Sequence, residues 1–217
     1  MDKNINNNGF EFVDLGLPSR TLWATCNVGA DKPTDYGQYF QWGDTIGYMA
    51  NEIETGDGQK KFTWNDYKWN PSGDGRTFTK YTHTGEMVEL EDDAANVNMG
   101  GDWHMPSSDQ IRELIDNTIV TWIALDNGTS GMKFTSKKDD SRSIFIPAAG
   151  YAWDGSVDDN GEYGLIWSCA LSTSHINNGQ YIYLISKDAS LYDKQGRGYG
   201  FPVRGVIGYF SSCLNMC

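Results

Sequence analysis

Residues 10–26 read FEFVDLGLPSRTLWATC, and this stretch decides how the fold begins. Two runs rich in apolar residues, 10–15 and 21–26, flank a turn at residues 16–19 that contains glycine, proline and serine. Short apolar runs bounded by such residues are typical of strands joined by a turn. A third short strand is expected at residues 39–42, where aromatic side chains are concentrated. The chain therefore begins as β structure.

Two helices are expected in the middle of the chain. Residues 90–97 carry acidic side chains in the first turn, where the positive end of the helix dipole stabilises them. The second helix begins with a capping box at residues 107–110. It places Ile111, Leu114 and Ile115 on one face, which is the pattern of a helix packed against a core.

The other parts of the chain are expected to be loops and short strands. Residues 44–85 contain scattered glycines and Pro71 and predict a long loop region. Later strands are expected at residues 131–136, 143–147, 166–168, 180–185 and 201–206. These elements predict an α+β fold with two helices, several short antiparallel strands and long loops. We expect a single domain at residues 10–210, between a flexible segment at 1–9 and a tail at 211–217.

The charge and hydropathy of the chain exclude several classes of partner. It has 217 residues, with 17 basic and 29 acidic side chains and a formal net charge of −12 at pH 7. A phosphate backbone would be repelled, so we expect no nucleic-acid partner, and anionic membrane surfaces are disfavoured for the same reason. No apolar run reaches the roughly 18 residues of a membrane span, so we expect no membrane insertion. Residues 1–9 lack the apolar stretch of a signal peptide, so a signal was either removed or never used.

The sequence predicts no catalytic residues, no metal site and no cofactor. His83, His104 and His175 lie in unrelated contexts, and no nucleophile, phosphate-loop or zinc-protease motif occurs. The cysteines are expected to be free thiols, with a Cys213–Cys217 bridge as the alternative. The remaining two cysteines are Cys26 and Cys169.

Some short polar motifs have two readings. The acid pairs at 92–93, 139–140 and 158–159 are interpreted as helix starts or solvated turns rather than calcium ligands. Residues 64–66 read WND and look like a lectin calcium motif, but they precede the helices, and we interpret the match as coincidence. Residues 127–129 match a glycosylation sequon, and we interpret them as a type I′ turn.

Several stretches together resemble the Fibrobacter succinogenes major paralogous domain, a family common in proteins of Bacteroidetes. The matching residues are 12–17, 22–30, 35–44, 90–95, 100–107, 146–151, 166–168 and 200–204. The resemblance implies a C-type-lectin-like fold of the formylglycine-generating-enzyme subtype. The reactive cysteines of that enzyme lie in a late glycine-rich segment with no clear counterpart here, so oxidase activity is not implied.

The same resemblance extends to the variable proteins of diversity-generating retroelements, which include phage tail receptor binders. These proteins vary a segment near the C-terminus, and residues 151–199 occupy the corresponding place here. The usual run Trp-Ser-Ser-Thr is replaced by WSCA at residues 167–170. Each of the two replacements fits one codon change at an adenine, although random drift explains them as well.

The pattern within this segment favours a binding face. Strand periodicity at residues 179–184 directs Ile182 and Leu184 inward and Tyr181 and Tyr183 outward. A polar loop precedes this strand, and tyrosine combined with small polar residues is typical of antibody binding surfaces. The alternative is an amphipathic edge strand beside a polar loop. The expected ligand-binding residues are Trp153, Tyr163, Leu171, Ser174, His175, Asn177, Asn178, Tyr181, Tyr183, Ser190, Tyr192, Lys194 and Tyr199.

Three functional hypotheses follow. The first is a retroelement-diversified receptor binder of a phage tail or prophage, whose partner is a protein or glycan on a cell surface. The second is a surface lipoprotein or adhesin module of a Bacteroidetes bacterium. The third is a cysteine-dependent oxidase. The first two place the protein on a virion or at the cell surface.

Overall fold

The computed structural model describes residues 4–5, 8–54 and 60–208. The segment expected at 1–9 and the tail expected at 211–217 lie partly or wholly outside these residues. Cys213 and Cys217 also lie outside them, and with them the alternative of a terminal disulfide.

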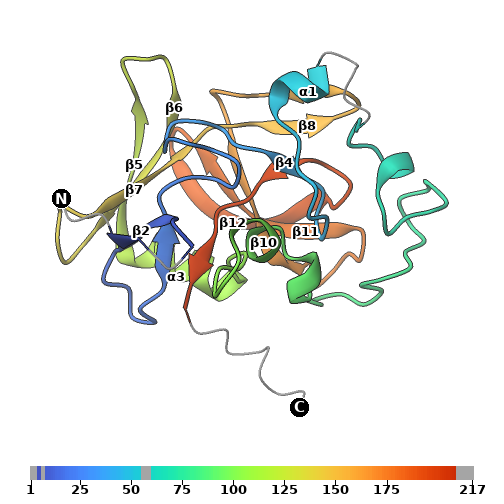
Figure 1. The fold of residues 1–217 in the computed structure, drawn as a ribbon, viewed down its shortest axis with the longest axis horizontal. Coiled ribbons are helices and arrows are strands. Elements are labelled where there is room, and N and C mark those ends of the chain that lie inside the picture. Colours follow the sequence, from blue (N-terminus) through green and yellow to red (C-terminus); the bar gives the residue numbers. More distant parts are fainter. Residues whose placement is uncertain (1–3, 6–7, 55–59, 209–217) are drawn as a thin grey trace.

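The beginning and the end of the described chain meet in one antiparallel sheet, with the strand order β1-β2-β3-β14. These strands are β1 (Asn4–Ile5), β2 (Glu11–Asp14), β3 (Leu22–Ala24) and β14 (Val206–Ile207). Figure 1 shows the blue N-terminal strands beside the red C-terminal one. The two strands predicted around the 16–19 turn are confirmed.

A second sheet has the order β5-β6-β7 and stands to one side of the molecule (Figure 1). Its strands are β5 (Thr118–Ala124), β6 (Ser130–Ser136) and β7 (Ser143–Pro147). The strands expected at 131–136 and 143–147 are confirmed, and they pair with each other. The turn between β5 and β6 is present, but only Gly128 in it has a positive φ, of 87°. A type I′ turn needs two residues with positive φ, so the predicted type I′ turn is wrong.

The helix α3 (Ser108–Asn117) leads directly into β5. Its predicted capping box is confirmed: the Ser107 side chain accepts from the Gln110 N–H at 3.2 Å, and the Gln110 side chain accepts from the Ser107 N–H at 2.9 Å. Ile111 and Leu114 are fully buried, and Ile115 packs against the same core, as the periodicity predicts.

The third sheet, β10-β11-β12, lies at the centre of the molecule (Figure 1). Its strands are β10 (Gly164–Leu171), β11 (Asn178–Ile185) and β12 (Asp188–Gly196). Every residue of β10 is buried. The side chains alternate between two cores, since Trp167 and Tyr181 belong to one and Ile166 and Ile182 to the other. The sheet is therefore packed on both faces.

Two two-stranded sheets and several short helices complete the described fold. The strand β4 (Tyr39–Phe40) pairs with β13 (Phe201–Pro202), and β8 (Tyr151–Trp153) pairs with β9 (Ser156–Asp158). The helical elements besides α3 are α1 (Ala50–Glu54), α2 (Ala94–Met99) and the 3-10 turns Trp64–Asp66 and Leu90–Asp92. The predicted strand at 39–42 and the loop character of the described part of 44–85 are confirmed, apart from these short turns.

The expectation of an α+β, C-type-lectin-like fold is wrong. Within the described residues the chain is mostly β, with five small antiparallel sheets and only three short α-helices. One reason is that the helix expected at 90–97 is interrupted at Asp93, whose backbone is extended. Another is that β5, β9 and β12 add strands that were not predicted.

One buried side chain joins distant parts of this fold. Arg204 is fully buried, and its guanidinium donates to four oxygens: the carbonyls of Ala24 at 2.9 Å, Thr25 at 2.8 Å and Phe145 at 3.1 Å, and the Asn27 side chain at 2.8 Å. Burial lowers the pKa of Arg204 to about 10, which leaves it charged at neutral pH. The arginine thus connects β3, β7 and the C-terminal strands.

Asp93 has a similar role on a smaller scale. The side chain is 1% exposed and caps α2 by accepting from the Asn96 N–H at 2.9 Å. It also accepts from the Met105 N–H at 2.8 Å, so it fixes the segment that precedes α3. Burial raises the pKa of this carboxyl to about 6, although the backbone N–H donors oppose the rise.

This shift predicts a pH dependence of stability. The pKa of Asp93 is higher in the folded chain than in the unfolded one, so the folded state binds more protons between about pH 4 and pH 6 and loses stability as pH rises through that window. The variant Asp93→Asn has no carboxyl to titrate at this position, so this pH-dependent contribution to the unfolding free energy is absent. The unfolding free energy of the natural chain, measured relative to Asp93→Asn, should fall by about 2 kcal/mol between about pH 4 and pH 7. Denaturant titrations that give the same difference at both pH values would contradict this account.

Candidate ligand-binding face

Four tyrosines lie together beside the central sheet. This tyrosine cluster consists of Tyr163, Tyr181, Tyr183 and Tyr192. Tyr181 and Tyr183 come from β11, Tyr192 is paired with Tyr181 across β12, and Tyr163 precedes β10. The rings of Tyr163 and Tyr183 are stacked with centroids 5.7 Å apart, and Tyr183 and Tyr192 are 5.0 Å apart. Their exposure is graded, from Tyr192 at 36% to Tyr181 at 5%.

A second set of aromatic rings forms the tryptophan group, which consists of Trp64, Tyr151, Trp153 and Tyr199. Trp153 and Tyr199 are stacked with centroids 4.0 Å apart and an interplanar angle of 15°. The edge of Trp64 meets Trp153 at 6.4 Å, and Tyr151 meets Tyr199 at 5.7 Å. Each of the four is partly exposed, so the group forms an aromatic surface on the β8-β9 hairpin.

An acidic residue acts on both aromatic sets. Burial raises the pKa of Tyr183, and Tyr163, Tyr192 and Asp159 add to the rise. Burial likewise raises the pKa of Tyr151, with Asp159 and Asp158 as the next causes. Asp159 thus raises the pKa of one tyrosine in each set, and the Tyr163 N–H donates to the Asp159 carbonyl at 3.0 Å.

The predicted polar loop, residues 172–178, is hydrogen-bonded to β12 beside the tyrosine cluster. The buried hydroxyl of Ser172 donates to Asp193 at 2.9 Å and accepts from the N–H groups of Ser174 and His175 at 3.1 Å. The Asn178 side chain donates to the Asp193 carbonyl at 3.2 Å. Ser174 and His175 remain exposed. The loop therefore presents polar groups from a fixed backbone.

The structure brings together part of the predicted site. Exposed or partly exposed side chains are found at eleven of the thirteen predicted positions: Trp153, Tyr163, Ser174, His175, Asn177, Asn178, Tyr183, Ser190, Tyr192, Lys194 and Tyr199. Within this set the direct ring contacts join Tyr163 to Tyr183, Tyr183 to Tyr192, and Trp153 to Tyr199. Lys194 lies over the Tyr192 ring at 5.9 Å.

Two predicted site residues are buried and need correction. Leu171 is 0% exposed and belongs to the core. Tyr181 was expected to face solvent, but its ring packs against Trp167 at 5.9 Å and Phe201 at 5.2 Å. The predicted alternation along β11 is correct. The error was to assume that the face opposite Ile182 is open to water, whereas another core covers it.

Sequence reasoning also missed three residues of this surface. Trp64 lies in the long loop region, far along the chain from Trp153, and no local pattern connects the two. Tyr151 ends the matching stretch at 146–151 and begins the segment at 151–199, but it was not among the expected binding residues. Asp159 belongs to an acid pair that was interpreted as a solvated turn, and its φ of 58° is consistent with a turn. The aromatic content of the segment was the only signal that pointed toward Tyr151.

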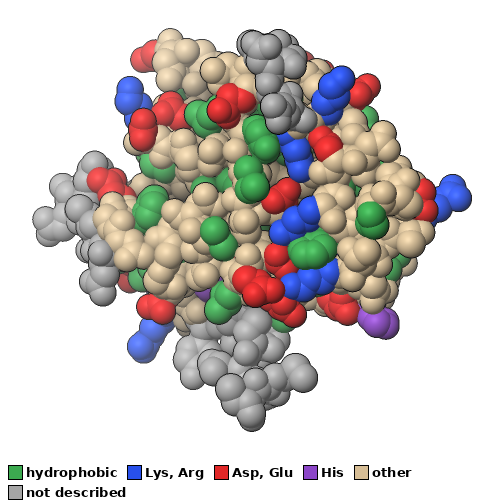
Figure 2. All heavy atoms as spheres, turned by 45° about the vertical axis from the view of Figure 1, so that its right-hand side comes forward, with side chains coloured by type: hydrophobic (Ala, Val, Ile, Leu, Met, Phe, Trp, Pro, Cys, Tyr) green, Lys and Arg blue, Asp and Glu red, His purple; other side chains and the backbone are tan. Residues whose placement is uncertain are grey.

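Two acidic sites elsewhere, the group Glu89, Glu91 and Asp92 and the carboxylate of Asp66, have partners within the described chain. Carboxylate oxygens of Glu89, Glu91 and Asp92 lie within 4.8 Å of one another, but the Lys80 ammonium contacts all three at 2.5–3.2 Å and supplies the cation. Figure 2 shows a face on which acidic and basic side chains are interleaved. The Asp66 carboxylate of the lectin-like WND run accepts from backbone N–H groups, including that of Thr63 at 2.7 Å. These carboxylates therefore have an ammonium or backbone N–H partner in the described chain.

The two described cysteines are not in disulfides, as predicted. Cys169 is 0% exposed and lies in the core, so a substrate cannot reach it without opening the sheet. Cys26 is partly exposed. Among the described residues no helix has both the length and the apolar character that crossing a membrane requires.

The contrast between Tyr181 and Tyr192 yields a stability prediction. Tyr181→Ala removes a buried ring and should lower the unfolding free energy by about 3 kcal/mol or more. Tyr192→Ala removes an exposed ring from the opposite strand of the same pair and should cost under about 1 kcal/mol. Urea unfolding followed by tryptophan fluorescence measures both. Equal losses for the two variants would show that the exposure gradient across the tyrosine cluster is wrong.

Comparison with protein-family models, curated proteins and solved structures finds no match to the chain.

Proposed function

We propose that the protein is a ligand-binding protein whose binding face is the tyrosine cluster together with the loop at residues 172–178. The observation that carries the proposal is a row of three exposed or partly exposed tyrosines in ring contact, Tyr163, Tyr183 and Tyr192, on a sheet that is packed on both sides. Tyrosine rings give large contact areas at a small cost in conformational entropy, and their hydroxyls form hydrogen bonds. An isolated exposed aromatic needs no explanation, but a contiguous group favours a binding role.

The rigidity of the support also favours binding. The strands β11 and β12 are paired along most of their length, and the buried Tyr181 ring anchors the exposed Tyr192 and Tyr183 rings beside it. The loop at 172–178 is held by Ser172 and Asp193. A partner would therefore meet side chains that are already ordered, which reduces the entropy lost on association.

The partner we propose is a protein or glycan receptor on a cell surface, with the protein acting as a phage tail or prophage receptor binder. This proposal rests on the resemblance of the quoted motifs to retroelement-diversified proteins. If residues 151–199 are diversified, exposed positions such as Tyr192, Lys194 and His175 can vary at little cost in stability. Buried ones such as Tyr181 and Leu171 should stay apolar or aromatic, because core changes cost several kcal/mol.

A cell-binding experiment tests the proposed face. The fluorescently labelled chain is titrated onto a panel of whole bacterial cells, and the double variant Tyr183→Ala, Tyr192→Ala is compared with the natural chain. We expect binding to weaken by about tenfold or more, since anchor residues contribute about 2 kcal/mol or more. Protease treatment of the cells should abolish binding if the receptor is a protein, and periodate treatment should abolish it if the receptor is a glycan.

The matched control is Phe10→Ala. Phe10 is an aromatic side chain with 37% exposure, close to the 36% of Tyr192, and it lies outside the proposed face. This variant should bind like the natural chain. Equal binding by the double variant and the natural chain, with the fold intact by circular dichroism, would refute the proposed face.

A further inference from the structure

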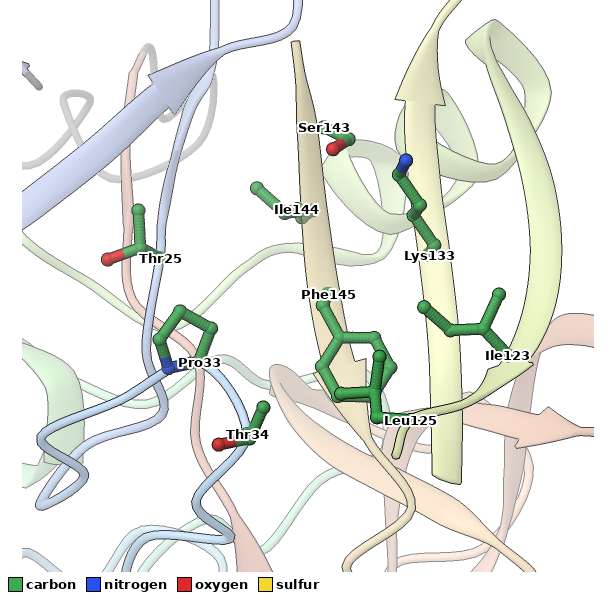
Figure 3. A pocket seen from close by; sticks show the side chains of 9 residues that line it. All are labelled: Thr25, Pro33, Thr34, Ile123, Leu125, Lys133, Ser143, Ile144 and Phe145. Carbon is green, nitrogen blue, oxygen red and sulfur yellow. The ribbon is translucent and has the colours of Figure 1, made fainter. Parts of the chain in front are cut away.

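A pocket lies on the other side of the fold, between the outer face of the β5-β6-β7 sheet and the N-terminal loops. Its volume is 320 Å³, within the range of small-molecule sites, which begins at about 300 Å³. Figure 3 shows the lining side chains, which come from three parts of the chain. They are Thr25, Pro33, Thr34, Ile123, Leu125, Lys133, Ser143, Ile144 and Phe145.

The lining has a polar end and an apolar end. In Figure 3 the Lys133 ammonium and the Ser143 hydroxyl lie toward one end, and Ile123, Leu125 and Phe145 lie toward the other. The strand register explains this order, because Lys133 is paired with Phe145 and its long side chain extends toward the neighbouring strand positions. A ligand that fills the pocket must therefore have one polar end and an apolar body.

Lys133 defines the charge that the polar end prefers. It is the only charged residue among those lining the pocket, and it is partly buried. In the part of the chain that the structure describes, its ammonium forms no hydrogen bond or ion pair with another side chain or carbonyl. Other lysines do find partners, as Lys137 does with the Asp116 carbonyl at 2.6 Å. An anion that entered the pocket would supply the missing partner of Lys133.

The walls of the pocket are fixed by Arg204. Its guanidinium bonds the carbonyls of Thr25 and Phe145, which belong to opposite walls. It also bonds the Asn27 side chain, which in turn donates to the Tyr36 carbonyl at 2.8 Å and so holds the loop that carries Pro33 and Thr34. Two of the three parts of the lining, 25–34 and 143–145, are thus connected to one buried group. Walls that are held in place before a ligand binds favour affinity.

We propose that this pocket binds a small amphiphilic carboxylate. The carboxylate would accept a charge-assisted hydrogen bond from the Lys133 ammonium and a second bond from the Ser143 hydroxyl. The apolar body would cover Ile123, Leu125 and Phe145. None of the lining residues is acidic, so a cationic ligand would face Lys133 with no compensating charge. This site is separate from the tyrosine cluster, and the inference does not depend on the proposed function.

Calorimetric titration with octanoate tests the proposal, with 1-octanol and octyltrimethylammonium as probes of the same tail length. Octanoate should bind at one site, 1-octanol should bind about tenfold more weakly, and the cation should not bind measurably. Amide chemical shifts should change in β6, β7 and the loop at 25–34. Octanoate that leaves those amides unshifted, or 1-octanol that binds equally well, would overturn the proposal.

Substitutions at lysine separate the site from general charge attraction. Lys133→Met should weaken octanoate binding about tenfold or more, to the level of 1-octanol, while Lys133→Arg should retain most of it. Lys187→Met is the matched control, because it makes the same charge change at an exposed position outside the pocket and should leave affinity within about twofold. Equal losses in Lys133→Met and Lys187→Met would show that octanoate responds only to the net charge of the protein.

Discussion

The fold depends on how a single buried guanidinium is satisfied. Arg204 is fully buried, and an unpaired charge in that position would cost several kcal/mol. Four oxygen acceptors surround it, from the β3 region and from β7, and each must be in place at once. The arginine therefore determines how the first strands, the β5-β6-β7 sheet and the C-terminal strands fit together. Backbone bonds from Ala24 to Gly205 and from Val28 to Val203, both at 2.9 Å, complete this junction.

The same junction explains why two candidate surfaces can coexist. On one side it brings the 25–34 loops over the β5-β6-β7 sheet and leaves a pocket between them. On the other side the C-terminal strand β13 places Phe201 on Trp167 at 4.0 Å and beneath Tyr181. The central sheet is thereby covered on both faces, and only the ends of its aromatic rows reach solvent. The two surfaces that we propose for ligand binding are therefore the parts that this packing leaves exposed, the tyrosine cluster and the pocket.

Local patterns predicted local structure well. The capping box of α3, the early strands and the alternation along β11 all follow from neighbouring residues, and the structure contains them. Features that depend on distant partners were not predictable in this way. The burial of Tyr181 requires Phe201 and Trp167, and the aromatic surface at Trp153 requires Trp64 from a loop without pattern. The α+β expectation failed because Asp93, bound to the Met105 N–H, ends one turn and starts another, so the expected helix is split.

The most direct test of the central claim is the unfolding free energy of Arg204→Lys, with the exposed Arg142→Lys as control. Lysine keeps the charge but cannot reach four acceptors in fixed directions, so several buried carbonyls lose their donor. We predict a loss of about 3 kcal/mol or more for Arg204→Lys and under about 1 kcal/mol for Arg142→Lys. An Arg204→Lys protein within about 0.5 kcal/mol of the natural chain would contradict the claim that this guanidinium organises the fold.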